Sequence, residues 1–280
     1  MILLDGKGTS ELIINELAQK VLNEGLHLKL VMVIVGENPA SLIYVRNKER
    51  ACKKANIESV TYRLEENATQ KQLLDIINKA NNDPTVNGIM VQMPLPKHID
   101  ENTILNAIDP DKDVDGLNMI NQGRLFTNVK GLVPATPKGI LSLCKYYNIS
   151  LTGKNCVVVG RSKLVGKPMG MLLLNNNATV TYTHSKTVNL KEITKKADIL
   201  IVAIGSAHFI TADMVKKEAV VIDVGTNRHN GQLTGDVDFD EVSKIASYIS
   251  PVPKGVGPMT IASLLENVYE AYKIQHGIND

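Results

Sequence analysis

The feature that most constrains the fold is a series of short apolar runs, each followed by a segment with helical spacing. The run "LKLVMVIVG" (28–36) is apolar almost throughout, which is typical of a strand buried on both faces of a sheet. Two further strand-like runs are "ESVTYRL" (58–64) and "VNGIMVQMPL" (86–95). Helical segments lie at 10–23, 41–56, 69–81 and after residue 100. This βαβαβ order predicts a mostly parallel sheet whose reactive groups gather beyond the carboxyl ends of the strands.

The alternation starts again after "VPATPKG" (133–139). A helix is expected at 137–147, followed by the strand-like runs "NCVVVG" (155–160), "ATVTYTH" (178–184), "ADILIVAIG" (197–205), "AVVIDVG" (219–225) and "ASYIS" (246–250). Short strands with turn residues at their ends indicate a second doubly wound sheet. A last helix, expected at 259–275, carries an apolar stripe that must pack against a core, formed by Ile261, Leu264, Leu265 and Val268. With 280 residues the chain is long enough for two domains, so the predicted fold class is a two-domain α/β protein.

Composition excludes several classes of protein. The chain is 44% hydrophobic and 21% charged, which indicates a packed globular protein. Its net charge of +2, without a long basic run, gives no indication of nucleic-acid binding. The cysteines, Cys52, Cys144 and Cys156, lack metal-ligand spacing, so no metal site is expected and a reduced, cytoplasmic setting fits best. No apolar run approaches a membrane span, and the N-terminus does not have the pattern of a signal peptide.

One lysine lies on the wrong face of the helix expected at 41–56. At about 100° per residue the charged side chains fall together on one side, and Lys48 falls in the middle of the small and apolar side. Burial disfavours an ammonium and lowers its pKa, which suits a lysine that exchanges protons during a reaction. The alternative is a lysine whose stem crosses the apolar face and whose amine reaches water.

The segment "VVVGRSKLVGKPM" (157–169) has the form of a phosphate-binding turn. A buried strand leads directly to Gly160, a polar turn and a helix, and backbone N–H groups at a helix start favour anions. The turn is not a P-loop, because Gly160 and Gly166 enclose five residues and Pro168 replaces the hydroxyl that binds Mg²⁺. The alternative is a plain connection between a strand and a helix.

The end of the next strand indicates which dinucleotide such a turn would bind. An NAD site usually has an acid there, whereas "TVTYTHSKT" (179–187) supplies His184, Ser185 and Lys186. With Arg161 nearby this corner is cationic and rich in donors, which favours the 2′-phosphate of NADP. The alternative is that His184 and Lys186 are ordinary exposed loop residues.

Seven motifs together resemble one known family. "NPASLIYVRNKERAC", "GIMVQMPLP", "DPDKDVDGLN", "ATPKG", "VVVGRSKLVGKPM", "THSKT" and "PVPKGVGPMT" occur in the order found in bifunctional methylenetetrahydrofolate dehydrogenase/methenyltetrahydrofolate cyclohydrolase, the FolD family. The resemblance runs from near residue 1 to near residue 270. It implies a homodimer of one-carbon metabolism and purine biosynthesis that acts on tetrahydrofolate substrates. It also implies a folate-binding catalytic domain, 1–120 plus 259–280, and a Rossmann-like NADP-binding domain, 121–258.

The resemblance also assigns roles to individual residues. The family's catalytic lysine, its tyrosine partner and its supporting glutamine fall on Lys48, Tyr44 and Gln92, which would also contact the substrate. The pterin-binding aspartate falls on Asp115. The NADP contacts fall on Gly160, Arg161, Ser162, Ser185 and Thr226. From the residues alone, Asp115 has the alternative role of a turn residue in "DPDKDVDG" (109–116).

The implied chemistry has two stages. Hydride passes from 5,10-methylenetetrahydrofolate to NADP⁺, and water then opens the methenyl ring to give 10-formyltetrahydrofolate, with Lys48 transferring protons. Rival interpretations are another two-domain NADP dehydrogenase, a dehydrogenase with little cyclohydrolase activity, and a dinucleotide-binding sensor without catalysis. One departure from the family concerns "PVPKGVGP", where Lys254 stands in place of a glycine found in many relatives. If that position needs a positive φ, the lysine is strained.

Overall fold

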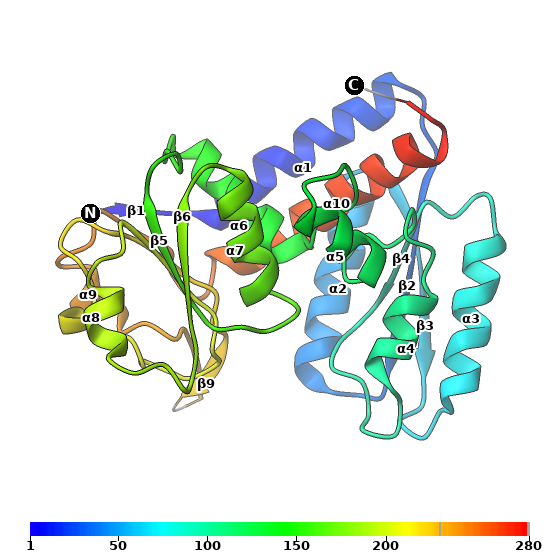
Figure 1. Ribbon diagram of the computed structural model, residues 1–280. Coiled ribbons are helices and arrows are strands. Elements are labelled where there is room, and N and C mark those ends of the chain that lie inside the picture. The colour runs from blue at the N-terminus through cyan, green and yellow to red at the C-terminus, as the bar shows by residue number, and fades with distance from the viewer. Residues whose placement is uncertain (230, 279–280) are drawn as a thin grey trace. The chain divides into compact units, whose positions relative to one another are not determined.

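The chain forms two compact units in the computed structural model, which describes residues 1–229 and 231–278. The six-stranded unit comprises Met1–Ser10 and Thr136–Thr260. The three-stranded unit comprises Glu11–Ala135 and the residues from Ile261 onward. Each unit has a parallel α/β sheet, as the sequence predicts (Figure 1).

The three-stranded unit is built on the order β3-β2-β4, with all strands parallel. The strands are β2 (Leu28–Val35), β3 (Ile57–Leu64) and β4 (Gly88–Val91). The helices that contribute to it are α1 (Gly6–Asn23), α2 (Pro39–Lys54), α3 (Gln70–Asn82), α4 (Glu101–Ala107), α5 (Met119–Phe126) and α10 (Val256–Gln275). A further parallel bridge joins Ile89 to Asp113, so residues 112–114 lie beside β4 and extend the sheet.

Strand β2 is buried on both faces, which explains its unbroken apolar sequence. The residues that face α1, α2 and α10 are Leu28, Leu30 and Met32, and those that face α3 and α4 are Val31, Val33 and Val35. In Figure 1, α2 and α3 accordingly lie on opposite sides of this sheet. The predicted stripe of the last helix packs against the first of these faces, with Leu264, Leu265 and Val268 fully buried and Ile261 partly buried.

The six-stranded unit has the order β1-β11-β8-β7-β5-β6, also parallel throughout. Its strands are β1 (Ile2–Leu3), β5 (Asn155–Val159), β6 (Thr179–Thr183), β7 (Ile199–Val202), β8 (Val220–Asp223) and β11 (Tyr248–Ile249). The remaining elements are α6 (Ala135–Tyr146), α7 (Gly166–Asn175), α8 (Leu190–Thr194), η1 (Ala212–Met214), the hairpin β9 (Asn227–His229) and β10 (Gln232–Thr234), and α9 (Phe239–Val242). Helices α6 and α7 cover one face of the sheet, and α8 and α9 lie on the other (Figure 1).

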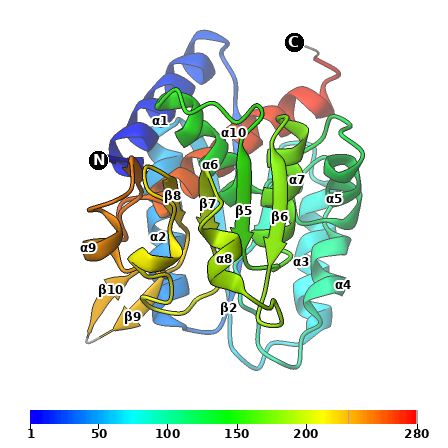
Figure 2. The same ribbon diagram turned by 60° about the vertical axis from the view of Figure 1, so that its left-hand side comes forward.

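Strand β5 lies between β6 and β7, as Figure 2 shows. The connection after β5 leads to β6 on one side of β5, and the connection after β6 leads to β7 on the other side. Doubly wound sheets bind ligands at such a switch point. Gly160 stands at this point with a φ of 126°, and a Cβ atom there would lie 2.3 Å from the carbonyl oxygen of Ala203. Because these two backbone segments lie so close together, only a glycine fits at position 160.

The compact units differ from the predicted domain limits in three places, one of which is the assignment of residues 259–260 to the six-stranded unit. Residues 1–10 belong to the six-stranded unit, because Ile2 pairs with Tyr248 of β11. Residues 121–135 belong to the three-stranded unit, where Asn121 of α5 donates a hydrogen bond to Asp113. In the part of the chain that the structure describes, no helix is long and apolar enough to cross a membrane.

Candidate functional sites

Helix α2 places Lys48 over the carboxyl end of β4. Asn38 caps the helix by accepting hydrogen bonds from the N–H groups of Ala40 and Ser41. Lys48 then falls on the inner face and is only 6% exposed, so its amine does not reach open water as the alternative interpretation required. Its Nζ donates to Oε1 of Gln92 at 3.1 Å and contacts Sδ of Met90 at 3.3 Å.

The surroundings of Lys48 favour the neutral amine. Burial lowers the pKa of Lys48, and the carboxylate of Asp115 acts in the opposite direction. Gln92 and Met90 are neutral partners, and within the described residues Lys48 forms no ion pair. A lysine in this position can gain and lose a proton nearer to neutral pH than an exposed lysine does.

Asp115 lies at the same edge of the sheet as Gln92, because residues 112–114 run parallel to β4. Its carboxylate makes no hydrogen bond among the described residues. The turn role considered for Asp115 is performed by Asp113, which accepts hydrogen bonds from the backbone N–H groups of Leu117 and Asn118. Burial raises the pKa of Asp115, and the nearby charge of Lys48 lowers it. The carboxylate of Asp115 is therefore a hydrogen-bond acceptor that has no donor among the described residues and lies near the amine of Lys48.

Tyr44 lies one turn before Lys48 on α2 and is partly buried. Lys48 contacts Met90 and Gln92, and in the described part of the chain Tyr44 makes no hydrogen bond.

The phosphate turn of the six-stranded unit connects β5 to α7. Ser162 organises this turn, because its hydroxyl accepts hydrogen bonds from the N–H groups of Val165 at 3.1 Å and Gly166 at 3.2 Å. Arg161 is exposed beside it. The turn therefore presents a cation at the helix start, with Gly160 at the switch point.

The end of β6 lies next to this turn, because Val159 pairs with Thr183 and the N–H of Gly160 donates to the carbonyl of Thr183 at 2.9 Å. The following residues form a closed turn in which Nδ1 of His184 accepts from the N–H of Lys186 at 3.1 Å. Ser185 and Lys186 are exposed, and residues 184–187 include no acid. The donor set at this corner fits a phosphate on a ribose 2′-oxygen.

Sequence reasoning missed two buried carboxylates close to Thr226, the exposed residue after β8. Asp236 accepts hydrogen bonds from Asn227 and from three successive backbone N–H groups, those of residues 204–206 after β7. Asp223 accepts from the N–H groups of Gly225, Asp236 and Val237. The available signal was an aspartate at a strand end in each of "IDVG" and "GDVD".

Two remaining expectations concern a strained loop and metal binding. Lys254 has a φ of 82°, so this position has the positive φ at which a lysine was expected to be strained.

Among the described residues, no group of three or more histidine, cysteine, aspartate and glutamate side chains could hold a metal ion.

Comparison with known families identifies the chain. The model of the catalytic domain of tetrahydrofolate dehydrogenase/cyclohydrolase matches residues 4–115, and the model of its NAD(P)-binding domain matches residues 134–276. The chain belongs to the tetrahydrofolate dehydrogenase/cyclohydrolase family. The second match extends over α10, although most of that helix packs in the core of the three-stranded unit.

Individual members of the tetrahydrofolate dehydrogenase/cyclohydrolase family are similar over almost their whole length. The bifunctional protein FolD of Streptococcus pneumoniae serotype 4 is 55% identical, covering 96% of both chains. That of Oceanobacillus iheyensis is 54% identical, covering 99% of this chain and 98% of the other. Among solved structures, the bifunctional FolD of Campylobacter jejuni is 48% identical with a TM-score of 0.95, covering 98% of this chain and 99% of the other.

The Trypanosoma brucei member of the family was crystallised with NADP cofactor and an inhibitor. It is 34% identical with a TM-score of 0.93, covering 98% of this chain and 97% of the other. Shikimate dehydrogenase of Thermus thermophilus, at 14% identity and a TM-score of 0.56, shares the fold alone.

Proposed function

We propose that this chain catalyses both reactions of its family. These are the NADP-dependent oxidation of 5,10-methylenetetrahydrofolate to 5,10-methenyltetrahydrofolate and the hydrolysis of that product to 10-formyltetrahydrofolate. The observation that carries the proposal is a buried lysine, Lys48, whose pKa is lowered, beside Asp115, a carboxylate without a hydrogen-bond donor. The alternatives of a sensor without catalysis and of an unrelated dehydrogenase do not account for this pair.

Asp115 is proposed to bind the pterin. A carboxylate accepts two parallel hydrogen bonds from neighbouring N–H groups, and the amino-pyrimidine edge of a pterin offers such a pair. Because Asp113 closes the turn, the carboxylate of Asp115 stays available for the substrate. The bound pterin would then lie beside Lys48 and Gln92, with Tyr44 on the same helix face completing the substrate site.

Lys48 is proposed to transfer protons in the hydrolysis. Water attacks the one-carbon bridge of the methenyl cation, a C–O bond forms, and the C–N5 bond breaks. Of the two protons that leave the water, one ends on N5 and the other is released. A neutral Lys48 can accept a proton from the water and return it to N5, while Gln92 directs the amine. A permanent ammonium would oppose a cationic substrate, so the lowered pKa serves the reaction.

The edge of the six-stranded sheet is proposed to bind NADP. Arg161, Ser185 and Lys186 would bind the 2′-phosphate, and Gly160, Ser162 and Thr226 line the switch point and its neighbouring strand end. NADP⁺, when bound, accepts the hydride from the one-carbon bridge. The contribution of these residues is binding and orientation.

The test supplies 5,10-methylenetetrahydrofolate with NADP⁺ or NAD⁺ and follows both NADPH and methenyltetrahydrofolate absorbance. Expected are NADPH formation, a preference for NADP⁺, and only transient methenyl product. A methenyl product that accumulates would identify a dehydrogenase without the hydrolase. The absence of both signals would overturn the proposed function.

We also propose the finer assignments that the family resemblance implies. The three-stranded unit would be the folate-binding catalytic domain, and the six-stranded unit the NADP-binding domain. The chain would act as a cytoplasmic homodimer that supplies one-carbon units for purine biosynthesis. The cytoplasmic assignment is supported by Cys52, Cys144 and Cys156, which are all free and buried. The homodimer is supported by the resemblance, and sedimentation of the purified chain would test it.

A further inference from the structure

We propose that Asp113 is a positioning residue, which holds Asp115 where the pterin binds; this inference rests on the function proposed above. Asp113 lies two residues before Asp115, and its side chain is 0% exposed. An aspartate buried to this extent is rare unless its carboxylate is fully hydrogen-bonded. The partners of Asp113 show what its carboxylate does.

The carboxylate of Asp113 closes the turn that carries Asp115. Its Oδ1 accepts from the N–H of Leu117 at 3.2 Å, and its Oδ2 accepts from the N–H of Asn118 at 2.8 Å. The carbonyl oxygen of Asp113 also accepts from the N–H of Gly116 at 3.0 Å. These three bonds hold the chain immediately after Asp115 and make no use of the Asp115 side chain. The turn is thus fixed while the substrate-binding carboxylate stays available.

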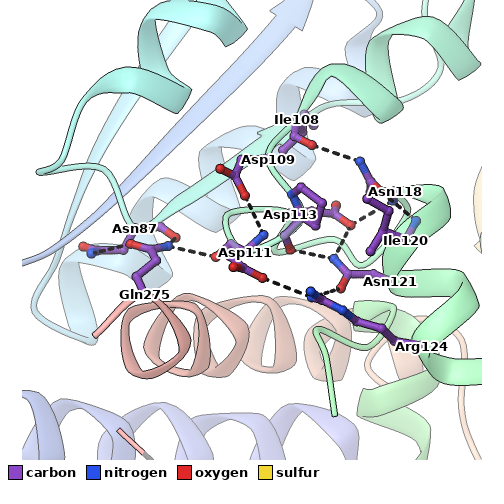
Figure 3. A network of polar contacts seen from close by, with 11 residues as sticks. Asn87, Ile108, Asp109, Asp111, Asp113, Asn118, Ile120, Asn121, Arg124 and Gln275 are labelled. Atoms are coloured by element: carbon purple, nitrogen blue, oxygen red, sulfur yellow. Dashed lines mark hydrogen bonds and ion pairs between the residues drawn. The ribbon is translucent and has the colours of Figure 1, made fainter. Parts of the chain in front are cut away.

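Helix α5 holds the Asp113 carboxylate from a second direction. Nδ2 of Asn121 donates to Oδ2 of Asp113 at 2.9 Å and to the carbonyl of Pro110 at 2.7 Å. Nη1 of Arg124 in turn donates to Oδ1 of Asn121 at 3.2 Å and to Oδ1 of Asp111 at 3.0 Å. Figure 3 shows Asn121 between Asp113 and Arg124, with its amide held at both ends. The orientation of the Asn121 amide, and so its bond to Asp113, is therefore fixed.

Helix α10 holds the backbone of the same segment. Nε2 of Gln275 donates to the carbonyl of Asp111 at 2.8 Å, as Figure 3 also shows. Nδ2 of Asn267, which is buried, donates to the carbonyls of Val114 and Val133 at 2.8 Å each. The backbone is therefore held on both sides of Asp113, and the turn that follows depends on the Asp113 carboxylate.

A carboxylate satisfies the donors at this position better than other side chains do. The two oxygens of the carboxylate accept three N–H groups together, whereas an asparagine has one acceptor oxygen and an alanine none. Burial makes this arrangement unfavourable and raises the pKa of Asp113 to about 6. The three hydrogen bonds act in the opposite direction and favour the ionised form. The contribution of Asp113 is therefore the geometry that it gives the turn.

The experiment compares Asp113→Ala and Asp113→Asn in the full chain, with Lys112→Met as a matched control. Lys112 is the buried neighbour of Asp113, but its amine donates to the carbonyls of Ala80, Asn81 and Asp83 at the end of α3. Losing it should lower the stability of the same unit without changing the turn. The measurements are the KM for 5,10-methylenetetrahydrofolate, the binding of tetrahydrofolate at equilibrium, the Kd for NADP⁺ and the melting temperature.

Asp113→Ala should raise the folate KM and weaken tetrahydrofolate binding roughly 10- to 100-fold, as a displaced binding group does. Asp113→Asn should recover most of this loss, because its oxygen can still accept from Asn118 and Asn121. The Kd for NADP⁺ should stay unchanged in all three variants. Lys112→Met should melt at a lower temperature and keep the folate KM of the parent chain.

The inference is overturned if Asp113→Ala keeps the folate KM of the parent chain, or if Lys112→Met raises it as much. If Asp113→Ala does not fold, the Asn variant decides: it should weaken tetrahydrofolate binding measurably more than Lys112→Met, and equal binding overturns the inference. The activity of the parent chain distinguishes a failure of this inference from a failure of the proposed function. A parent chain that turns over no methylenetetrahydrofolate refutes the function, whereas an active parent with an unaffected Asp113→Ala variant refutes the positioning role alone.

Discussion

The amide of Gln92 is oriented by two different partners, and this orientation presents its oxygen to Lys48. Its Nε2 donates to the carbonyl of Met93 at 2.7 Å, so Oε1 is the atom that accepts from Nζ of Lys48 at 3.1 Å. The side chain of Gln92 can accept from the amine whether Lys48 is charged or neutral. A neutral acceptor therefore fixes the position of the amine without stabilising its charge as a carboxylate would.

Lys48→Met should abolish the cyclohydrolase while leaving the fold intact. Loss of the proton-transferring group should lower the hydrolysis rate by about 10²- to 10⁴-fold. The melting temperature should stay the same or rise, because the variant replaces a buried amine with an apolar side chain of similar length. Hydrolysis of methenyltetrahydrofolate, followed by absorbance, measures the first effect. A variant that hydrolyses this substrate at the parent rate would remove Lys48 from the mechanism.

Gln92→Glu should move the cyclohydrolase optimum to higher pH. A carboxylate in contact with Nζ would raise the pKa of Lys48 and keep it as an ammonium at neutral pH. The rate at pH 7 should fall by at least about tenfold and recover in part as the pH rises. The pH profile of hydrolysis measures this, with Gln92→Ala as the control that removes the contact without adding charge. An unchanged pH optimum in the Glu variant would contradict the role given to the neutral amine.

Arg161→Ala should weaken the binding of NADP⁺ more than the binding of NAD⁺. A charge-assisted contact to a phosphate contributes about 1.5–3 kcal/mol, which corresponds to roughly 10- to 100-fold in the KM for NADP⁺. The KM for NAD⁺ should change by less than about threefold, because NAD⁺ has no 2′-phosphate. Lys216→Ala is the control, since this exposed lysine of the same unit pairs with Asp198 instead. Equal losses for the two dinucleotides would refute the assigned 2′-phosphate contact.

Asp223 should make unfolding depend on pH in a defined direction. Burial, with a contribution from the charge of Asp236, raises the pKa of Asp223 to about 6, above the ordinary value of about 3.9. The folded chain therefore holds this proton more tightly, and the stability it contributes is lost as the pH rises through about 6. Asp223→Asn removes the effect. Denaturant unfolding measures the free energy of unfolding of parent and variant at about pH 5 and about pH 7.5. The free energy of unfolding of the parent, relative to that of the variant, should be smaller at the higher pH. A constant gap would contradict the raised pKa.

Lys254→Gly should stabilise the chain. At a φ of 82° a lysine is strained by roughly 1–3 kcal/mol, and glycine relieves this at a smaller entropic cost, leaving a gain of about 1 kcal/mol. Lys97→Gly is a matched control, because Lys97 is also exposed and follows a proline but has no positive φ. That variant should be less stable than the parent chain. Thermal unfolding compares the two, and a loss of stability in Lys254→Gly would exclude strain at this position.

Patterns with a regular period predicted most of the fold. The spacing of apolar residues in the last helix predicted the stripe that packs against β2, and the helical wheel of α2 predicted that Lys48 lies on its apolar face. Strand β1 could not be predicted in the same way. Two residues have no period, and the partner of Ile2 is Tyr248, almost the whole chain away.

Which aspartate of "KDVDG" closes the turn and which stays available for a ligand also could not be predicted from the residues alone. Asp113 and Asp115 are both aspartates of one turn-rich segment, and either could close a turn. The choice depends on where Leu117, Asn118 and Asn121 place their N–H groups, which only the folded segment determines. Residue type limits the possible roles, and tertiary contacts assign them.

The place of α10 in the core has a consequence for how the chain is made. The strands of the three-stranded unit leave the ribosome early, but Leu264, Leu265 and Val268, which cover one face of β2, are synthesised near the end. Until translation finishes, that face lacks its final cover, and an incomplete apolar surface is prone to aggregate. The core of the three-stranded unit is therefore completed only when α10 has been synthesised, although β2 and β3 can pair much earlier.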